Sequence, residues 1–192
     1  MTETASGARR LSKLWYAAPA AVLLVTLAVA MSHLSRGSKL VEERIQGLER
    51  SEAPGQSPLT FDRAGEYILY VEGPVTPSGY IDPGEIILLP AEPESRRITL
   101  REYPDFVTYT DPSGLGGRAA FSFTVPEPGR YTVKVRRTPD DVTGIAIGRY
   151  VYRGADAPVR TAFEVAAAGI AFAIVLTTAI AVRRRIPWGT AA

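Results

Sequence analysis

Two long apolar segments, one near each end of the chain, constrain its fold more than any other feature. The first covers residues 14–34 and the second covers residues 160–182. Each is close to the roughly 20 residues that an α-helix needs to cross the hydrocarbon core of a bilayer. The sequence between them is rich in Tyr, Val and Thr, with many turn-forming Gly and Pro residues. We therefore expect a membrane-anchored all-β protein, with an antiparallel β-sandwich between two transmembrane α-helices.

Basic residues on the outer flanks of these segments predict the topology. Arg9, Arg10 and Lys13 precede the first segment, and Arg183–Arg185 follow the second. Lys and Arg in short flanks stay on the cytoplasmic side of a membrane. We expect residues 1–13 and 183–192 to be cytoplasmic tails at the plasma membrane, with the central domain outside. The formal net charge of +2 comes from these basic tails, because the rest of the chain is slightly acidic. No basic stripe with interleaved aromatics appears, so no nucleic-acid partner is expected.

The first apolar segment also has the features of a cleaved signal peptide. A basic start precedes its apolar core, and Ala28-Val29-Ala30 resembles a cleavage site. The apolar character continues through Met31 to Leu34, which favours an uncleaved anchor. Cleavage would leave a single-pass protein with the same external domain.

Residues 35–58 are expected to form a stalk and a linker. The stalk has apolar residues at the spacing of one helix face: Leu40, Val41, Ile45 and Leu48. This pattern predicts a short helix that continues the membrane helix, or one that contacts a second copy of the chain. Residues 51–58 include two prolines and a glycine, which indicates a linker.

Residues 59–155 are expected to form the external β-sandwich. Alternation is clearest at Phe121–Val125 and at Tyr131–Val135, where one face is apolar and the other polar. Asp82-Pro83-Gly84 and the stretch from Asp111 to Gly114 mark turns. Short strands at this spacing are typical of an antiparallel sandwich. The expected strands are Glu66–Glu72, Glu85–Leu89, Arg97–Tyr103, Phe106–Thr110, Ala119–Val125, Tyr131–Arg137 and Gly144–Tyr152.

A near-repeat links the strands that begin near Gly65 and Gly129. In both, Gly is followed two positions later by Tyr, here Tyr67 and Tyr131, and then by apolar residues at every second position. The glycine permits a positive φ where the strand begins. The tyrosine resembles the corner tyrosine of Greek-key sandwiches, whose hydroxyl bonds back to the preceding turn. We expect two such structural corners.

These motifs carry a resemblance to a class of actinobacterial membrane proteins. The stretches are AGEYILYVEGP, FVTYTDPSGLGGRAAFSFTVPEPGRYTVKV and GIAIGRYV, followed by a helix ending in RRR. In that class an immunoglobulin-like or jelly-roll-like external domain lies between two membrane helices. The resemblance covers most of the chain from Phe61 onward. It implies architecture alone, because it brings no catalytic or binding residue with it.

The sequence offers little material for catalysis. It contains one histidine, His33, and no cysteine, so neither a His/Cys zinc site nor a catalytic triad can be built within one chain. The Asp140-Asp141 pair indicates a hairpin turn, with weak calcium ligation as the alternative. The glycines between Gly114 and Gly117 precede an expected strand, which indicates a hairpin connection rather than a phosphate-binding loop. We expect no enzyme, no cofactor and no metal.

Two functions remain open at this point. The first is an interaction domain that binds another membrane or envelope protein, such as an accessory subunit of an envelope complex. The second is a module that binds an envelope polysaccharide or glycolipid. A sugar ring could stack on the exposed face of a tyrosine, although packing within strands is the more usual role of this residue. The tyrosines concerned are Tyr70, Tyr80, Tyr103, Tyr109, Tyr150 and Tyr152.

Small residues in the second apolar segment predict helix packing. Ala167 and Ala171 are four residues apart, as are Gly169 and Ala173. This spacing lets a neighbouring helix approach closely. Ala17 and Ala21 of the first segment have the same spacing but lie at the opposite end of an antiparallel pair. We therefore expect the Gly169 face to pack against another chain, either a second copy or another subunit.

Overall fold

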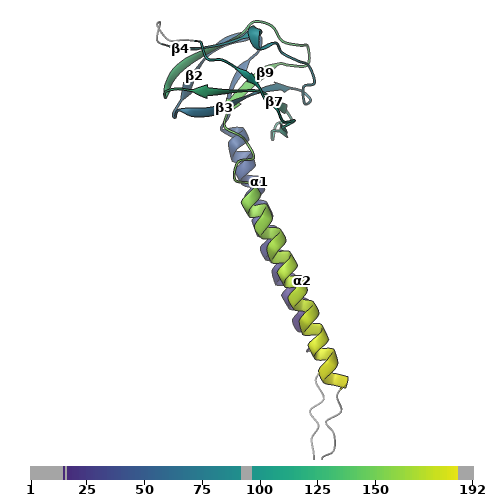
Figure 1. Cartoon of the computed structure of the whole chain (residues 1–192). Coiled ribbons are helices and arrows are strands. Elements are labelled where there is room, and N and C mark those ends of the chain that lie inside the picture. The colour runs from purple at the N-terminus through teal and green to yellow at the C-terminus, as the bar shows by residue number, and fades with distance from the viewer. Residues whose placement is uncertain (1–14, 16, 92–96, 186–192) are drawn as a thin grey trace, which may run out of the picture. The chain divides into compact units, whose positions relative to one another are not determined.

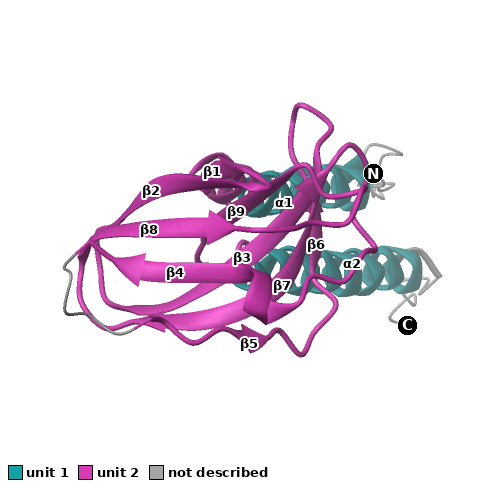
Figure 2. Cartoon of the chain, turned by 90° about the horizontal axis from the view of Figure 1, so that it is seen from above, with its two compact units in different colours: residues 1–38, 154–192 teal, residues 39–153 magenta. Residues whose placement is uncertain are grey.

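The fold was obtained as a computed structural model that describes residues 15, 17–91 and 97–185. Figure 1 labels the helices and strands of the chain, which divides into two compact units (Figure 2). We call residues 1–38 with 154–192 the helical unit, and Lys39–Arg153 the β-unit. The basic flank formed by Arg9, Arg10 and Lys13 lies outside the described residues.

Two helices follow the apolar segments, and each is longer than its segment. Helix α1 covers Ala17–Gln46 and helix α2 covers Asp156–Arg185. Pro19 and Pro158 both lie in first turns, where a missing N–H leaves no intrahelical bond unmade. Both helices are long and apolar enough to cross a bilayer. The expected helical stalk is confirmed, because α1 continues without a break through residue 46.

Within the helical unit the two helices pack against each other in antiparallel fashion. A Cβ built on Gly169 of α2 would lie 2.2 Å from the Thr26 methyl carbon of α1. Gly37, further along α1, instead meets Val159 and Pro158 near the start of α2. Small residues line the contact and permit this close approach. The buried ones are Ala30, Gly37, Ala162 and Ala173.

The expectation that the Gly169 face is free for another chain is therefore wrong. Gly169 and Ala173 do pack against a helix, but Gly169 meets the chain's own α1 at Thr26. The expectation considered only Ala17 and Ala21 as partners, whereas Thr26, in the first third of α1, is also small enough. Ala167 and Ala171 are exposed.

The β-unit is a pair of antiparallel sheets in the part of the chain that the structure describes. The larger sheet has the order β1-β9-β3-β7-β5, with β6 also paired to β7, and the smaller has the order β2-β8-β4 (Figure 2). The strands are β1 Glu49–Glu52, β2 Gly55–Phe61, β3 Gly65–Gly73, β4 Ile86–Pro90, β5 Arg101–Glu102, β6 Thr108–Thr110, β7 Gly116–Val125, β8 Gly129–Val135 and β9 Gly144–Gly148.

A single apolar core joins the inner faces of the two sheets. Alternate residues of β3 and β7 meet alternate residues of β2, β4 and β8, as the period-2 pattern requires. Phe61 is its aromatic centre, with ring centroids 4.6 Å from Tyr67 and 5.1 Å from Tyr131. This arrangement confirms an all-β unit between two apolar helices.

The linker expected at residues 51–58 is wrong, because these residues belong mostly to strands. Glu49–Glu52 pairs with β9, and Gly55–Phe61 pairs with β8 along its whole length. Pro58 misled the interpretation, since proline cannot donate to a ladder. It is tolerated here because β2 is an edge strand of the smaller sheet. The β-structure therefore begins ten residues before the expected boundary at residue 59.

A second apolar cluster covers the outer face of the larger sheet. Ile45 and Leu48, at and just beyond the end of α1, pack with Ile68, Tyr70 and Val151. Tyr70 and Ile68 alternate with the core residues of β3, so this strand is buried on both faces. The apolar face predicted for the stalk thus covers the sheet, although Leu40 is exposed.

Candidate functional site

The two structural corners form the hydrogen bonds that their spacing predicts. The Tyr67 hydroxyl donates to the Arg63 carbonyl at 3.0 Å, and the Tyr131 hydroxyl donates to the Glu127 carbonyl at 2.7 Å. Gly65 has a φ of +125° and Gly129 a φ of +155°, where a side chain would be strained. Both tyrosine rings are buried, so these residues fix the fold and present no reactive group.

The two polar loops singled out from the sequence are turns. Asp141 accepts hydrogen bonds from the Ser78 and Gly79 amides at 2.8 and 3.0 Å. These hydrogen bonds lower the pKa of the Asp141 carboxyl group, and the bond from the Gly79 amide has the largest effect. Residues 111–115 form the hairpin connection from β6 to β7, as expected, and Gly116 and Gly117 are the first residues of β7. No cluster of three or more His, Cys, Asp or Glu that could hold a metal occurs among the residues described here.

Most of the tyrosines proposed as platforms are packing residues. Tyr70 and Tyr109 are buried in the second cluster, and their rings meet edge to face with centroids 5.3 Å apart. Tyr103, Tyr150 and Tyr152 are partly buried against the same cluster. Tyr80 is the exception, with 64% of its surface exposed.

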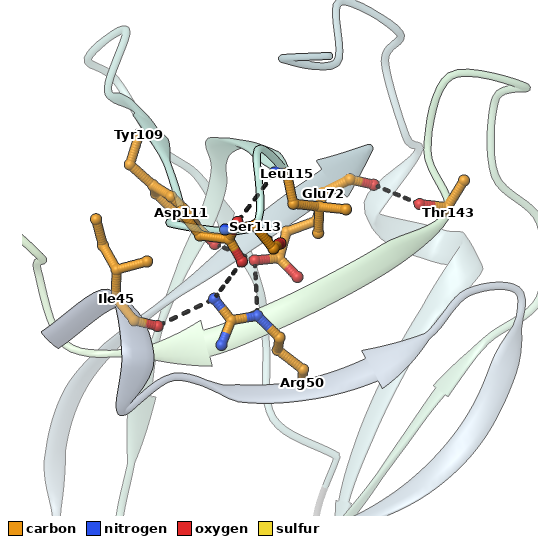
Figure 3. Close-up of polar contacts among 8 residues, drawn as sticks. All are labelled: Ile45, Arg50, Glu72, Tyr109, Asp111, Ser113, Leu115 and Thr143. Carbon is orange, nitrogen blue, oxygen red and sulfur yellow. Dashed lines mark hydrogen bonds and ion pairs between the residues drawn. The ribbon is translucent and has the colours of Figure 1, made fainter. Parts of the chain in front are cut away.

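A buried carboxylate, which sequence reasoning missed, lies at the centre of a polar network (Figure 3). Glu72 of β3 is only 2% exposed. Its Oε1 accepts a hydrogen bond from the Tyr109 hydroxyl at 2.5 Å and another from Arg50 Nε at 3.1 Å. Arg50 Nη2 donates to the Ile45 carbonyl at 3.0 Å and lies 3.6 Å from Asp111 Oδ2. The network therefore joins the end of α1 to β1, β3 and β6.

The polar groups of this network are occupied by one another. Burial, followed by the bond to Glu72, raises the pKa of the Tyr109 hydroxyl well above its usual range, so the hydroxyl remains a donor. The Asp111 carboxylate is occupied by the Ser113 amide and hydroxyl and the Leu115 amide, and the Ser113 hydroxyl is the main cause of its lowered pKa. One signal was available: Glu72 alternates with Ile68 and Tyr70, which places it on the buried outer face.

An exposed aromatic hollow lies where β5, β7 and their loops meet. Phe106 is 82% exposed, and no large apolar side chain among the described residues is more exposed. Phe106 and Tyr80 line a pocket of about 240 Å³ together with Glu102 and Asp105. The Tyr80 hydroxyl donates to Glu102 at 2.7 Å. Arg118, at the same pocket, donates to the carbonyls of Pro77 and Gly79.

The fold defines a class of protein in which an antiparallel two-sheet unit is joined in sequence to two long apolar helices. In this chain the two-sheet unit also contains a buried, hydrogen-bonded polar network. Comparison with protein-family models, with curated proteins and with solved structures finds no match for the chain. The functional argument therefore rests on the geometry of these surfaces.

Proposed function

We propose that the protein is a membrane-anchored, extracytoplasmic interaction domain that binds a protein partner, such as a subunit of an envelope complex. The exposure of Phe106 is the observation that carries this proposal. Leaving an aromatic ring in water forgoes about 1.5–3 kcal/mol of burial free energy. Aromatic residues, Phe among them, are enriched in the cores of protein interfaces.

The surface around Phe106 also indicates the chemistry of the partner. Glu102 and Asp105 flank the ring, and neither forms an ion pair within the described ranges of the chain. Arg118 has its guanidinium turned to backbone carbonyls of the same unit. A partner that places an apolar group on Phe106 and a Lys or Arg beside the two carboxylates would complement this surface.

Photocrosslinking in cells tests the protein partner. A benzoylphenylalanine at position 106 should yield a discrete crosslinked product, and the same probe at Leu89, which is exposed on the edge strand β4, should not. A product of twice the chain's mass would identify the partner as a second copy. Equal labelling at both positions, or none at either, would contradict the proposal.

A carbohydrate ligand is the second candidate, supported by the pairing of rings and carboxylates in one hollow. Sugar rings stack on aromatic faces while carboxylates accept their hydroxyl hydrogens, and Tyr80 and Glu102 present both groups. Binding of isolated envelope glycan by the purified chain, abolished by Phe106→Ser, would favour this candidate. Glycan binding that persists in the Phe106→Ser variant would contradict a carbohydrate site in this hollow.

We further propose that both chain termini are cytoplasmic and the β-unit extracytoplasmic. Support comes from the basic residues outside both apolar segments, which the bilayer retains on the inner side. A fluorescent reporter that matures only in the cytoplasm should be active at either terminus and inactive when it is inserted after Ala91 of the β-unit. Activity at that insertion would reverse the topology.

A further inference from the structure

An arginine-lined pocket in the β-unit is separate from the aromatic hollow. It has a volume of about 630 Å³ and includes the corner tyrosine Tyr67. Volumes of roughly 300–1,000 Å³ are usual for small-molecule sites. Four arginines line it, contributed by the end of α1, the β2–β3 turn and the segment after β9: Arg44, Arg63, Arg149 and Arg153.

None of these four arginines is neutralised by an ion pair within the described part of the chain. Both ion pairs there involve Arg50, which lies outside the pocket. Three carboxylates also line the pocket: Glu43, Glu49 and Asp62. One of them, Glu49, accepts a hydrogen bond from the Thr60 amide. The pocket is therefore lined by four guanidinium groups and three carboxylates that form no ion pairs with one another.

Two of the arginines are held in place by the fold. Arg44 donates one N–H to the Tyr150 carbonyl at 3.3 Å, which leaves its remaining N–H groups available. Arg149 lies over the face of Tyr67, with its guanidinium carbon 5.6 Å from the ring centroid. The side chains of Arg63 and Arg153 make no hydrogen bond to any other described residue, so they remain free to engage a ligand.

We propose that this pocket binds a compact phosphate-bearing anion. Guanidinium groups present planar pairs of donors that match phosphate oxygens, and four of them surround one space here. The three carboxylates disfavour an extended polyanion, because it would bring negative charge against each of them. A single phosphate group can instead sit among the arginines alone.

Two sources could supply this chemistry: the headgroup of a phospholipid, or a soluble phosphate ester. The covalent chain favours the lipid. Arg153 precedes the first residue of α2 by three positions, and Arg44 lies in the last turn of α1. Arg44 therefore belongs to the end of one bilayer-length helix, and Arg153 belongs to the short segment that leads into the other.

Binding measurements on the full chain in detergent test the proposal with both sources. The probes are phosphatidylglycerol, phosphatidylcholine as the lipid lacking net charge, and glycerol 1-phosphate as the soluble ester. We expect saturable binding of phosphatidylglycerol, detected by native mass spectrometry, and weaker binding of the ester, detected by calorimetry. The double variant Arg63→Gln/Arg153→Gln should weaken binding about tenfold or more, since charged hydrogen bonds are lost.

A matched variant separates the pocket from net charge. Arg136→Gln/Arg137→Gln removes the same charge from exposed positions outside the pocket and should bind like the parent. Arg63→Lys/Arg153→Lys keeps the charge but loses the paired donors, so it should bind weakly while unfolding at the parent's midpoint. The proposal is overturned if neither phosphatidylglycerol nor glycerol 1-phosphate binds. It is also overturned if both glutamine double variants lose binding equally, or if the variants at Arg63 and Arg153 bind like the parent.

Discussion

Tyr67 and Tyr131 each combine a buried ring with a hydroxyl that closes a turn four residues upstream. Each residue thereby contributes to both the apolar core and the backbone hydrogen bonding of a corner. Phe61 packs between the two rings, which couples the corners through one side chain. At the scale of single residues, each corner tyrosine thus stabilises the sandwich with its ring in the core and its hydroxyl on a turn.

Removing one hydroxyl measures what a corner contributes. Tyr131→Phe keeps the ring but leaves the Glu127 carbonyl without its 2.7 Å donor. The free energy of unfolding should fall by about 1 kcal/mol or somewhat more. Urea unfolding of the full chain in detergent, followed by circular dichroism of the strands, measures it. Tyr80→Phe, at an exposed tyrosine, is the control and should change much less. A Tyr131→Phe chain as stable as its parent would contradict the corner's contribution.

The buried tyrosines Tyr70 and Tyr109 should make the β-unit sensitive to alkali. Burial raises the pKa of both hydroxyls above the usual value near 10. Above about pH 10 the unfolded chain loses these protons while the folded chain keeps them. Stability should therefore fall with rising pH, by about 1.4 kcal/mol per pH unit for each tyrosine.

Tyrosinate absorbance during an alkaline titration checks this prediction. Of the nine tyrosines, these two should ionise only together with the cooperative loss of strand structure. Ionisation of all nine near pH 10 in a chain that stays folded would show that the two hydroxyls are not buried.

Strand β7 provides the clearest test at the scale of an element. A Cβ at Gly117 would lie 2.2 Å from the Tyr109 ring, so the glycine is what lets this ring lie across the strand. Gly117→Ala should displace the ring, disturb its bond to Glu72 and cost about 1–3 kcal/mol. In a Tyr109→Ala background the same change should be nearly neutral, which a double-mutant cycle in urea would show. Equal costs in both backgrounds would contradict the contact.

The sequence predicted elements well where one physical pattern dominated. Alternation at Phe121–Val125 and Tyr131–Val135 placed β7 and β8, and the apolar segments placed both helices. It failed at β1 and β2, because Glu49–Glu52 is almost entirely exposed and proline interrupts the second strand. These two segments form strands because they pair with β9 and β8. Partners so distant in the sequence leave no pattern in the residues of the strand itself.

The candidate sites were less predictable than the fold. Glu72 could be placed on a buried face from its alternation with Tyr70, but its partners Arg50 and Tyr109 are 22 and 37 residues away. The four pocket arginines are spread from residue 44 to residue 153, so only the folded chain brings them together. Phe106 was assigned to a strand, whereas it lies in the loop before β6.

For the whole molecule, the pairing of α1 with α2 can be captured covalently. A Cβ at Gly37 would lie 3.7 Å from the Cβ of Pro158, within the roughly 3.5–4.5 Å that a disulfide needs. The chain has no cysteine, so Gly37→Cys/Pro158→Cys creates a single possible bridge. Oxidation should close it within one chain and change the chain's mobility on a non-reducing gel.

The control pair is Ser38→Cys/Pro158→Cys, because Ser38 is exposed on α1 and should not reach the second cysteine. If Gly37→Cys/Pro158→Cys instead links two chains to each other, the helices pair between copies and the arrangement within one chain is wrong.

The way β1 and β9 adjoin has a mechanical consequence. The chain enters β1 at Glu49, which is opposite Ile147, and leaves β9 one residue later, at Gly148. Entry and exit therefore lie at the same end of one antiparallel ladder. A force that drew the two helices apart would first load the contacts just outside that end, the Arg44–Tyr150 hydrogen bond and the packing of Ile45 and Leu48 on Val151. Once these contacts break, the ladder would open one bond at a time, so the β-unit would open first between its first and last strands.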